Sequence, residues 1–435
     1  MTFLEERPGY LCGAMRMAGI QRLAFIRDAV SEQIVATHVL GRELAAWMNE
    51  ASPDFDGHEA VFLQISPRTG VLQSAFVHRT CRGQAAGGVR FRDYPSLADF
   101  FHDGLRLSRG MTLKNALAGL WWGGGKGVMA LDSAWVDVRG HREAIYEDYG
   151  AFLTTLRGAY VTAEDVGTLP EDMAAVFKTT RFVTCIPPHL GGSGNPSEPT
   201  ASGVVVGMEA ALHHLALGGL EGKTVAVQGL GQVASFLIEK LLSRGVKAVL
   251  AADVEAARCR AAKGSFPERV EIRQVDPEDT TILAEPVDIL APCAVGAVLN
   301  ARTIPTVRAM IVCGAANNQL EDPPRDDAAL AQRGVLYVPD FLVNRMGIVN
   351  CADEQAGYVV PDPVVAAHLS REWEEGIFQH ALQVFAEAQR SERAPGAVAL
   401  EMAQARSRVL HPLWGHRALA IARGVVATGW AEGRL

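Results

Sequence analysis

The sequence predicts an α/β protein of two domains, one of them built on a parallel, doubly wound sheet. Its 435 residues exceed what one ordinary hydrophobic core holds and are enough for two. Between residues 224 and 339, short apolar segments alternate with helical patterns, which is typical of parallel strands joined by crossover helices. The third observation is a G-x-G-x-x-A turn that joins the first of these segments to a helix.

The first domain is expected over residues 1–195, and hydrophobic periodicity predicts its elements. Apolar residues recur near helical spacing between Leu23 and Val35, so the first 50 residues predict helices. Two strand-like segments then flank a turn that contains Pro67 and Gly70, which predicts a hairpin. The expected elements after the N-terminal helices are strands at 60–65 and 71–78 and helices at 96–118 and 141–157.

A loop rich in glycine, serine and proline at 191–200 is the expected hinge to the second domain, which we place at 196–345. The expected elements of that domain are a helix at 201–217, a strand at 224–228, a helix at 232–244 and strands at 248–252, 287–292, 309–314 and 334–339. Residues 346–435 are expected to be mainly helices that pack back on the first domain. A cleft between the domains would then be the natural ligand site.

Composition excludes several classes of function. The formal net charge is −8 and no basic run occurs, which argues against a nucleic-acid partner. No apolar run approaches the roughly 20 residues of a membrane span, and the N-terminus does not resemble a signal peptide. The seven cysteines form no C-x-x-C pair, and their odd number fits a disulfide framework poorly. We therefore expect a cytoplasmic protein without membrane contact and without a bound metal ion.

The turn Gly229-Leu-Gly231-Gln-Val-Ala234 predicts a dinucleotide site of the Rossmann type. The first glycine permits a tight turn, the second lets the backbone approach a pyrophosphate, and the small third residue lets helix pack on strand. Asp253 ends the next strand, where a carboxylate can bind the ribose hydroxyls and repel a 2′-phosphate. The pattern therefore favours NAD over NADP. The alternative is an ordinary strand–turn–helix with a capping aspartate.

Two lysines and an aspartate form the candidate catalytic group. Lys114 and Lys126 lie in apolar, glycine-rich surroundings, where glycines would let substrate and backbone come close. Two neighbouring, partly desolvated ammonium groups should lower one pKa toward neutrality, so that one lysine can act as a general base. Asp165, flanked by small residues, could shuttle protons. The alternative is a set of solvated surface charges.

Several ordered segments resemble the glutamate/leucine/phenylalanine/valine dehydrogenase family, and within it the leucine and phenylalanine dehydrogenase branch. The resemblance extends from about residue 55 to 410. Its segments are GGVR (87–90), RGMTLK (109–114), GGGK (123–126), TAEDVGT (162–168), PSEPTASGV (196–204), VAVQGLGQVA (225–234), APCA (291–294), GAANNQL (314–320), PD (339–340) and NCADE (350–354). These separate matches occur in the same order as in the family.

The resemblance implies an NAD-dependent amino acid dehydrogenase, commonly a homo-oligomer, that converts an L-amino acid reversibly into its 2-oxo acid and ammonia. Residues 1–195 would be the substrate-binding and oligomerisation domain, and 196–345 the dinucleotide-binding domain. Lys114 would hold the substrate α-carboxylate, Lys126 would activate water, and Asp165 would exchange protons. The implied cofactor-binding residues are Thr200, Gly229, Gly231, Gln232, Val233, Asp253, Cys293, Ala294 and Asn317.

Differences from the family pattern bear on the substrate. Ala86 stands where glutamate enzymes carry a lysine, so no ammonium is offered there to a second carboxylate. The other expected substrate-binding residues, besides Lys114, are Gly87, Met111, Ala163, Asn318, Ile348 and Cys351. Most of these are small or apolar, which favours an apolar or aromatic amino acid and argues against glutamate.

Arg345 and Met346 stand where the family usually has small residues. Arg345 could line the cleft and limit the substrate, or bind an acidic group on an unusual one; the alternative is a side chain that points to solvent. The same two residues are the one feature that favours a weakened paralogue that binds nucleotide without turnover. The intact Lys114, Lys126 and Asp165 favour an active enzyme.

Overall fold

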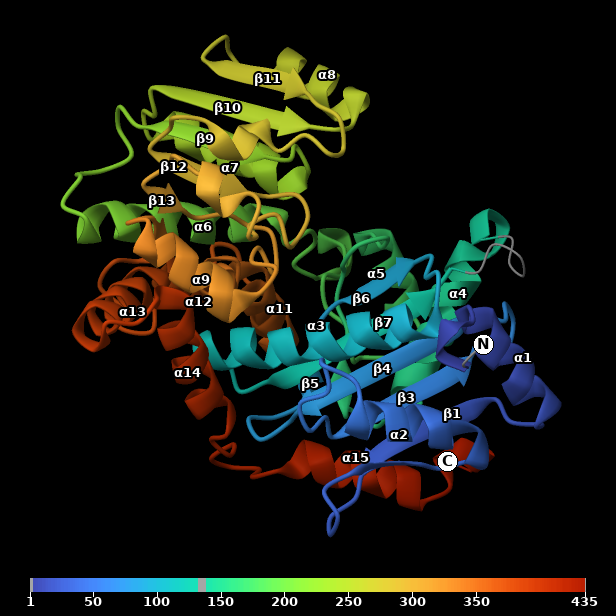
Figure 1. The fold of residues 1–435 in the computed structure, drawn as a ribbon. Helices are drawn as coiled ribbons and strands as arrows, with labels where there is room; N and C mark the ends of the chain where they lie inside the picture. Colours follow the sequence, from blue (N-terminus) through green and yellow to red (C-terminus); the bar gives the residue numbers. More distant parts are fainter. Residues whose placement is uncertain (1–2, 132–137, 435) are drawn as a thin grey trace. The chain divides into compact units, whose positions relative to one another are not determined.

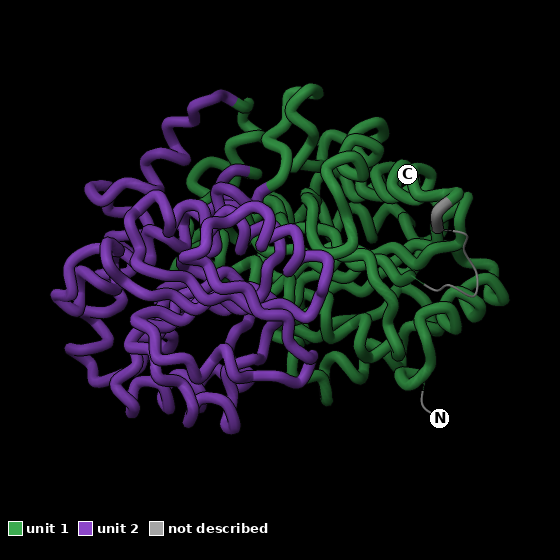
Figure 2. The backbone as a smooth tube through the Cα atoms, turned by 90° about the horizontal axis from the view of Figure 1, so that it is seen from above, with its two compact units in different colours: residues 1–195, 351–358, 404–435 green, residues 196–350, 359–403 purple. Residues whose placement is uncertain are grey.

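The computed structural model describes residues 3–131 and 138–434 (Figure 1), and it divides into two units (Figure 2). Unit 1 comprises Met1–Asn195, Cys351–Tyr358 and Gln404–Leu435, and unit 2 comprises Pro196–Asn350 and Val359–Ala403. The C-terminal part, expected as one block on the first domain, is instead shared between the units. Two helices, α11 (Met346–Ala356) and α14 (Pro395–Ser407), each run across a unit boundary.

Unit 1 is built on a mixed eight-stranded sheet. Its path is β2-β1-β3-β4-β7-β5-β8, and β6 pairs with β7 beside that path. The strands are β1 (Arg22–Arg27), β2 (Ile34–Ala36), β3 (Ala60–Ile65), β4 (Leu72–Arg79), β5 (Ala85–Ala86), β6 (Val89–Arg92), β7 (Gly123–Ala130) and β8 (Tyr160–Val161). The strands β1, β3, β4 and β7 pair antiparallel, whereas β5 and β6 run parallel to β7. The expected hairpin of β3 and β4 is confirmed.

Helices cover both faces of this sheet. They are α1 (Pro8–Met17), α2 (Arg42–Glu50), α3 (Leu97–Leu117), α4 (Val138–Thr155), α5 (Pro170–Phe177) and α15 (Arg417–Ala427), with short 3-10 turns η1 (Phe3–Glu5), η2 (Val39–Gly41), η3 (Pro188–Leu190) and η6 (Trp430–Glu432). Apolar residues of α1, α2 and α3 share one core with Phe25 and Phe76 of the sheet. On the opposite face, Phe62 packs against Trp430, which also contacts Phe152 of α4.

The expectation of helices throughout the first 50 residues is wrong for residues 22–36. Leu23 and Phe25 are buried two positions apart in β1, which pairs antiparallel with β3 on one side and β2 on the other. Val30, counted as part of a helical face, is 93% exposed in the turn between β1 and β2. Pairing with neighbouring strands determines the structure of this segment. The apolar residues counted for the helix belong partly to strands and partly to a turn, and their combined spacing is close to that of a helix.

Unit 2 contains a six-stranded parallel sheet in the order β11-β10-β9-β12-β13-β14. The strands are β9 (Thr224–Gln228), β10 (Ala248–Asp253), β11 (Val270–Gln274), β12 (Ile289–Pro292), β13 (Ile311–Val312) and β14 (Leu336–Tyr337). Numbered within the unit, this is the order 3-2-1-4-5-6 of a Rossmann fold, in which ligands bind beyond the carboxyl ends of the strands. The predicted fold class is therefore confirmed.

The helices of unit 2 are α6 (Ser197–His214), α7 (Gln232–Ser243), α8 (Ala256–Ser265), α9 (Pro323–Gln332), α10 (Asp340–Val343), α12 (Pro363–Leu369) and α13 (Ile377–Ser391), with 3-10 turns η4 (Thr281–Ala284) and η5 (Ile304–Thr306). The helix α6 begins within the segment expected to be a loop. Pro199 is tolerated there because the first N–H groups of a helix have no partner within it. The edge strand β11 was not predicted from the sequence, since only Val270 and Ile272 of its residues are buried.

Arg345 and Met346 belong to the core of unit 2. Arg345 is 0% exposed; its Nη1 lies 2.8 Å from Nδ1 of His380 on α13, and its Nη2 donates to the carbonyl of Glu375. Met346 is also fully buried, and a Cβ atom added to Gly203 of α6 would lie 2.8 Å from its Cγ. The structure therefore contradicts both expectations for Arg345: it neither points to solvent nor reads a substrate, but fastens the α10–α11 junction to α13.

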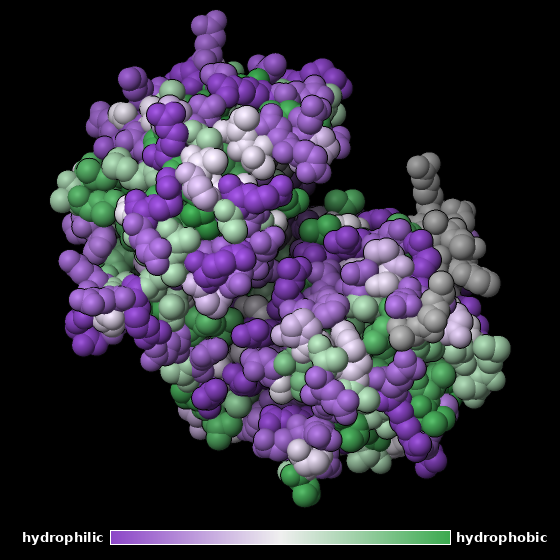
Figure 3. Space-filling view, in the orientation of Figure 1, coloured by the Kyte–Doolittle hydropathy of each residue, from purple (hydrophilic) through white to green (hydrophobic). Residues whose placement is uncertain are grey.

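Polar and apolar residues are mixed over the face of the molecule drawn in Figure 3, where hydrophilic residues predominate. Within residues 3–131 and 138–434, every helix is too short or too polar to cross a membrane.

Replacing Arg345 should lower stability without changing which amino acids react. The Arg345→Met variant removes a fully buried guanidinium and leaves His380 and the carbonyl of Glu375 without that hydrogen-bond donor, which typically costs about 1–3 kcal/mol. The control is Arg390→Met, because Arg390 is 75% exposed and pairs with Glu387 of its own helix turn. Thermal unfolding measures the difference. A stable Arg345→Met protein with altered relative rates over a panel of amino acids would contradict the structural role.

Candidate active site

Lys126 lies near the middle of β7, in a strand whose glycines are dictated by packing. A Cβ atom at Gly124 would lie 2.2 Å from the backbone nitrogen of Thr112 on α3, and one at Gly125 would lie 2.6 Å from the ring of Tyr160. These gaps are filled by protein, so the glycines are explained by the close approach of α3 and β8 rather than by a substrate. Lys126 projects from the same face as Gly124, because side chains alternate along a strand.

Asp165 follows β8 in a short loop that fixes its position. The backbone N–H of Asp165 donates to the hydroxyl of Thr168 over 2.8 Å, and that hydroxyl donates back to the carbonyl of Asp165 over 2.7 Å. Its Oδ2 accepts a hydrogen bond from Nζ of Lys126. The side chain of Lys126 is 6% exposed and that of Asp165 is 19% exposed. The structure therefore brings together the two residues predicted to be catalytic, in a largely buried ion pair.

A second ion pair continues from the first. Nε of Arg90, on β6, lies 3.5 Å from Oδ2 of Asp165. Its Nη1 donates to both carboxylate oxygens of buried Asp103 on α3, each over 3.0 Å, and Tyr94 donates to the same carboxylate over 2.7 Å. Cations and anions thus alternate from Lys126 through Asp165 and Arg90 to Asp103, which limits the cost of burying them.

The network sets the protonation of the central pair. Burial lowers the pKa of Lys126, and the positive charge of Arg90 lowers it further, while Asp165 acts in the opposite direction. Burial alone would raise the pKa of Asp165, but the charges of Lys126 and Arg90 hold that pKa well below its usual range. The predicted lowering of a lysine pKa is thus found at Lys126. Its main cause is burial, and the cation beside it is Arg90.

Glu164 adds a further titratable group to this loop. Burial, followed by the negative charge of Asp165, raises the pKa of Glu164 to about 7. Its Oε2 is buried without a hydrogen-bond partner. Glu164, Arg90 and Asp103 were not singled out from the sequence. The one sequence feature that could have indicated Arg90 as a site residue is its position in the GGVR segment. No feature of the sequence indicates that Asp103 belongs to the site.

The expected substrate-binding residues fall in both units. Ala86 of β5 is buried and pairs with Gly124 of β7, and a Cβ atom at Gly87 would lie 2.8 Å from Cγ of Met111 on α3. Lys114 is half-buried in the last turn of α3. Unit 1 also contains buried Ala163 and Cys351, whereas Asn318 and Ile348 lie in unit 2. In unit 1 this set combines one cation with small or apolar side chains.

Unit 2 contains the expected dinucleotide turn. Gly229 has a φ of +97°, a left-handed conformation that favours glycine, and a Cβ atom there would lie 2.8 Å from Cβ of Ala294. Gly231 precedes α7, and a Cβ atom added to it would meet nothing within 4 Å. The backbone can therefore be approached where a pyrophosphate would bind at the start of α7. Ala234, the small third residue, is fully buried.

Asp253 ends β10 and braces the same turn. Its Oδ2 accepts a hydrogen bond from the N–H of Leu230 over 2.7 Å, and its Oδ1 accepts from the N–H of Glu255 over 2.8 Å. The remaining expected cofactor residues within unit 2 are Thr200 on α6, Gln232 and Val233 in the first turn of α7, Cys293 and Ala294 after β12, and Asn317 after β13. The turns after β9, β10, β12 and β13 all leave the carboxyl edge of the sheet, so these turn residues share one edge.

Both halves of the chain match models of known families. Residues 69–182 match the dimerisation domain of the Glu/Leu/Phe/Val dehydrogenases, and residues 191–407 match the Glutamate/Leucine/Phenylalanine/Valine dehydrogenase model. The leucine dehydrogenase of Geobacillus stearothermophilus is 41% identical over 70% of this chain and 80% of its own length. The valine dehydrogenase of Streptomyces coelicolor is 38% identical over 82% of this chain and 94% of its own.

A solved structure agrees with these sequence relatives. The L-tryptophan dehydrogenase of Nostoc punctiforme is 32% identical, with a TM-score of 0.63 over 80% of this chain and 96% of that one. The matched regions contain the lysine–aspartate pair of unit 1 and the glycine turn of unit 2. The chain is therefore an amino acid dehydrogenase that belongs to the glutamate/leucine/phenylalanine/valine dehydrogenase family.

Proposed function

We propose that this protein catalyses the reversible, NAD-dependent oxidative deamination of an apolar L-amino acid to its 2-oxo acid and ammonia, as a cytoplasmic homo-oligomer. The observation that carries the proposal is the buried pair of Lys126 and Asp165, whose pKa values are both lowered. Relatives named leucine, valine and tryptophan dehydrogenase support an apolar substrate. The match to a dimerisation domain supports assembly, and the seven free cysteines suit a reducing compartment.

The proposed chemistry uses the two residues in different protonation states. Asp165 remains a carboxylate at neutral pH and can accept a proton from the amino group of the substrate. Lys126 can lose its proton more readily than an exposed lysine, and as a neutral amine it deprotonates the water that attacks the imine carbon. Lys114 supplies a cation for the α-carboxylate. Asp165 then returns the proton that it accepted to the nitrogen of the carbinolamine, and ammonia leaves as the carbinolamine hydroxyl gives its proton to the Asp165 carboxylate, which forms the carbonyl of the 2-oxo acid.

A nicotinamide cofactor fits the residues of unit 2. The open backbone at Gly231 and the left-handed Gly229 provide the phosphate turn, and the Asp253 carboxylate lies at the strand end where a ribose would bind. Thr200, Cys293, Ala294 and Asn317 are the residues proposed to contact the rest of the cofactor. The bound nicotinamide supplies the acceptor for the hydride of the substrate Cα. The negative charge of Asp253 favours NAD over a cofactor with a 2′-phosphate.

A panel of amino acids tests the proposed function. We expect leucine, valine, phenylalanine or tryptophan to exceed glutamate in kcat/KM by at least about 100-fold, because a second carboxylate against Ala86 and Met111 would be buried unpaired. The assay is NADH formation at alkaline pH. Lys126→Met should lose about 10²–10⁴-fold in kcat, whereas Lys178→Met, at an exposed lysine of the same unit, should not. Glutamate as the best substrate would overturn the assignment.

The pH dependence should report on Arg90. Deamination is expected to rise with pH as Lys126 becomes neutral. In Arg90→Gln the pKa of Lys126 rises, because a neighbouring positive charge is removed, so this rise should move to higher pH. The matched control is Arg92→Gln on the same strand, where the side chain is exposed. The measurement is kcat against pH, with circular dichroism to check the fold. An unchanged profile in Arg90→Gln would exclude this electrostatic role.

Asp253 should decide between the two nicotinamide cofactors. We expect Asp253→Ser to reduce the ratio of kcat/KM for NAD to that for NADP by roughly 10- to 100-fold, which corresponds to the loss of a charge-assisted hydrogen bond of ~1.5–3 kcal/mol. Glu255→Ser, at an exposed acid two residues further on, should leave the ratio unchanged. Equal efficiency of the wild-type protein with both cofactors would remove Asp253 as the discriminating residue.

A further inference from the structure

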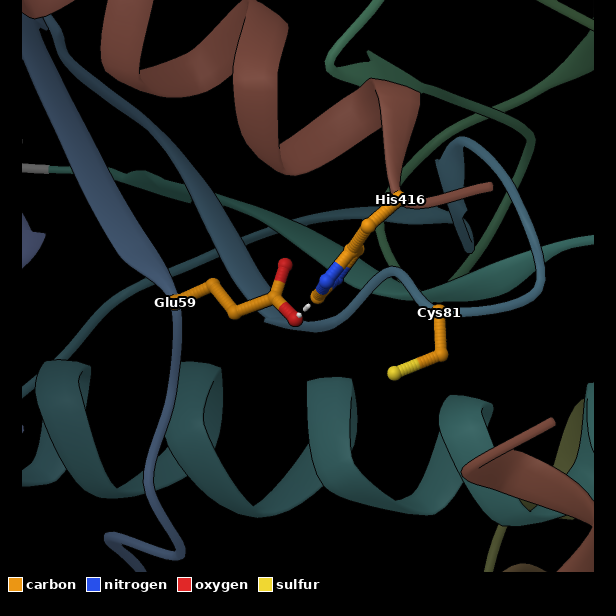
Figure 4. A group of neighbouring side chains, drawn as sticks. All are labelled: Glu59, Cys81 and His416. Atoms are coloured by element: carbon orange, nitrogen blue, oxygen red, sulfur yellow. Dashed lines mark hydrogen bonds and ion pairs between the residues drawn. The ribbon is translucent and has the colours of Figure 1, made fainter. Parts of the chain in front are cut away.

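Three side chains of unit 1 that take no part in the proposed reaction converge on one point. They are Glu59 just before β3, Cys81 just after β4 and His416 at the start of α15 (Figure 4). One ligand atom from each lies within 4.8 Å of the others, and Nε2 of His416 lies 3.0 Å from Oε1 of Glu59. We propose that these residues form a binding site for a zinc-type divalent cation that fastens the C-terminal helix to the sheet.

The chemistry of the donors selects the class of cation. A thiolate, an imidazole and a carboxylate are ligands that Zn²⁺ accepts together, whereas Ca²⁺ and Mg²⁺ require oxygen ligands. The carboxylate and thiolate charges would balance those of the dication. Tetrahedral zinc holds its ligand atoms about 3.5 Å apart, so a modest rotation of the side chains would close the site. Water can complete the tetrahedron, because Cys81 and His416 are only partly buried.

Neighbouring backbone and side chains hold the ligands in place. Oε1 of buried Glu59 accepts the N–H of Thr80 over 3.0 Å, and Oε2 accepts the hydroxyl of the same residue. The carbonyl of Cys81 accepts the N–H of His411 over 2.9 Å, which ties the segment before α15 to the turn after β4. Partners that orient ligands in this way are typical of metal sites. The bound ion would add a link between α15 and β3, two elements far apart in the sequence.

The sequence suggested no metal site, because the three ligands stand at positions 59, 81 and 416 and form no recognisable spacing. Hydrogen bonding alone is the competing explanation, since Glu59 and His416 already form a pair without an ion. His416 also hydrogen-bonds the thiol of Cys81 without an ion, so the two explanations differ in the bond that the sulfur forms: only a metal site produces a thiolate–metal bond.

Cobalt provides the direct test on the full-length protein. Metal-free wild-type protein is titrated with Co²⁺ and its absorption is recorded. We expect one equivalent to produce tetrahedral visible bands and a thiolate-to-cobalt charge-transfer band, both displaced by Zn²⁺. Cys81→Ser should lose the charge-transfer band, and Cys12→Ser, at a buried cysteine of the same unit, should retain it. Thr80→Val removes a hydroxyl partner of Glu59 and should weaken Co²⁺ binding about 10- to 100-fold.

A second measurement needs no variant. Bound Zn²⁺ should protect Cys81 of the wild-type protein from alkylation, as followed by mass spectrometry of the peptides, and should raise the unfolding temperature. If wild-type protein shows no charge-transfer band and Zn²⁺ changes neither alkylation of Cys81 nor the unfolding temperature, the metal site is rejected and the hydrogen-bonded explanation holds.

Discussion

The burial of two opposite charges, Lys126 and Asp165, is the constraint on which unit 1 depends. Removing an ion from water costs several kcal/mol unless a partner and further hydrogen bonds compensate. Asp165 is held by Thr168 and lies beside Arg90, whose own charge is balanced by Asp103. The glycines at 123–125 of β7 allow α3 and β8 to approach closely enough to enclose the pair. The glycines of β7, the Arg90–Asp103 ion pair and the lowered pKa values of Lys126 and Asp165 are therefore all connected with the burial of this one ion pair.

Much of the fold could be predicted from the sequence, because local patterns and tertiary structure agree over most of it. The strand β9, the glycine turn and α7 were placed within a residue, since hydrophobic period, turn chemistry and helix start all indicate one structure. The predictions of secondary structure are wrong or incomplete where the local pattern and the tertiary structure disagree. Residues 22–36 carry apolar residues at a spacing near that of a helix, but they form β1 and β2, and β1 pairs with β3. Edge strand β11 has too few buried residues for its period to be recognised.

The site was predictable to the extent that its chemistry lies in short segments. Lys126 stands in a glycine-rich segment and Asp165 in the short segment TAEDVGT, and the structure joins them in an ion pair. Asp103 of α3 gives no such signal, because its function depends on contact with Arg90 of strand β6. The error at Arg345 has the same origin: its partner His380 lies 35 positions further along the chain, and nothing local indicates that a cation there would be buried. Because Arg345 and Met346 both lie in the core of unit 2, they no longer favour an inactive paralogue.

The charge network also bears on when Lys126 can act as a base. In the structure Asp165 raises the pKa of Lys126 and so opposes the effects of burial and of Arg90. A substrate ammonium group that pairs with Asp165 would compete for the same carboxylate and bring another positive charge close to Lys126. Both effects lower the pKa of Lys126, because each disfavours its charged form. On the proposed function, substrate binding would thus weaken the ion pair with Asp165 that keeps Lys126 protonated. Asp165 would therefore both stabilise Lys126 in the free enzyme and determine when Lys126 loses its proton.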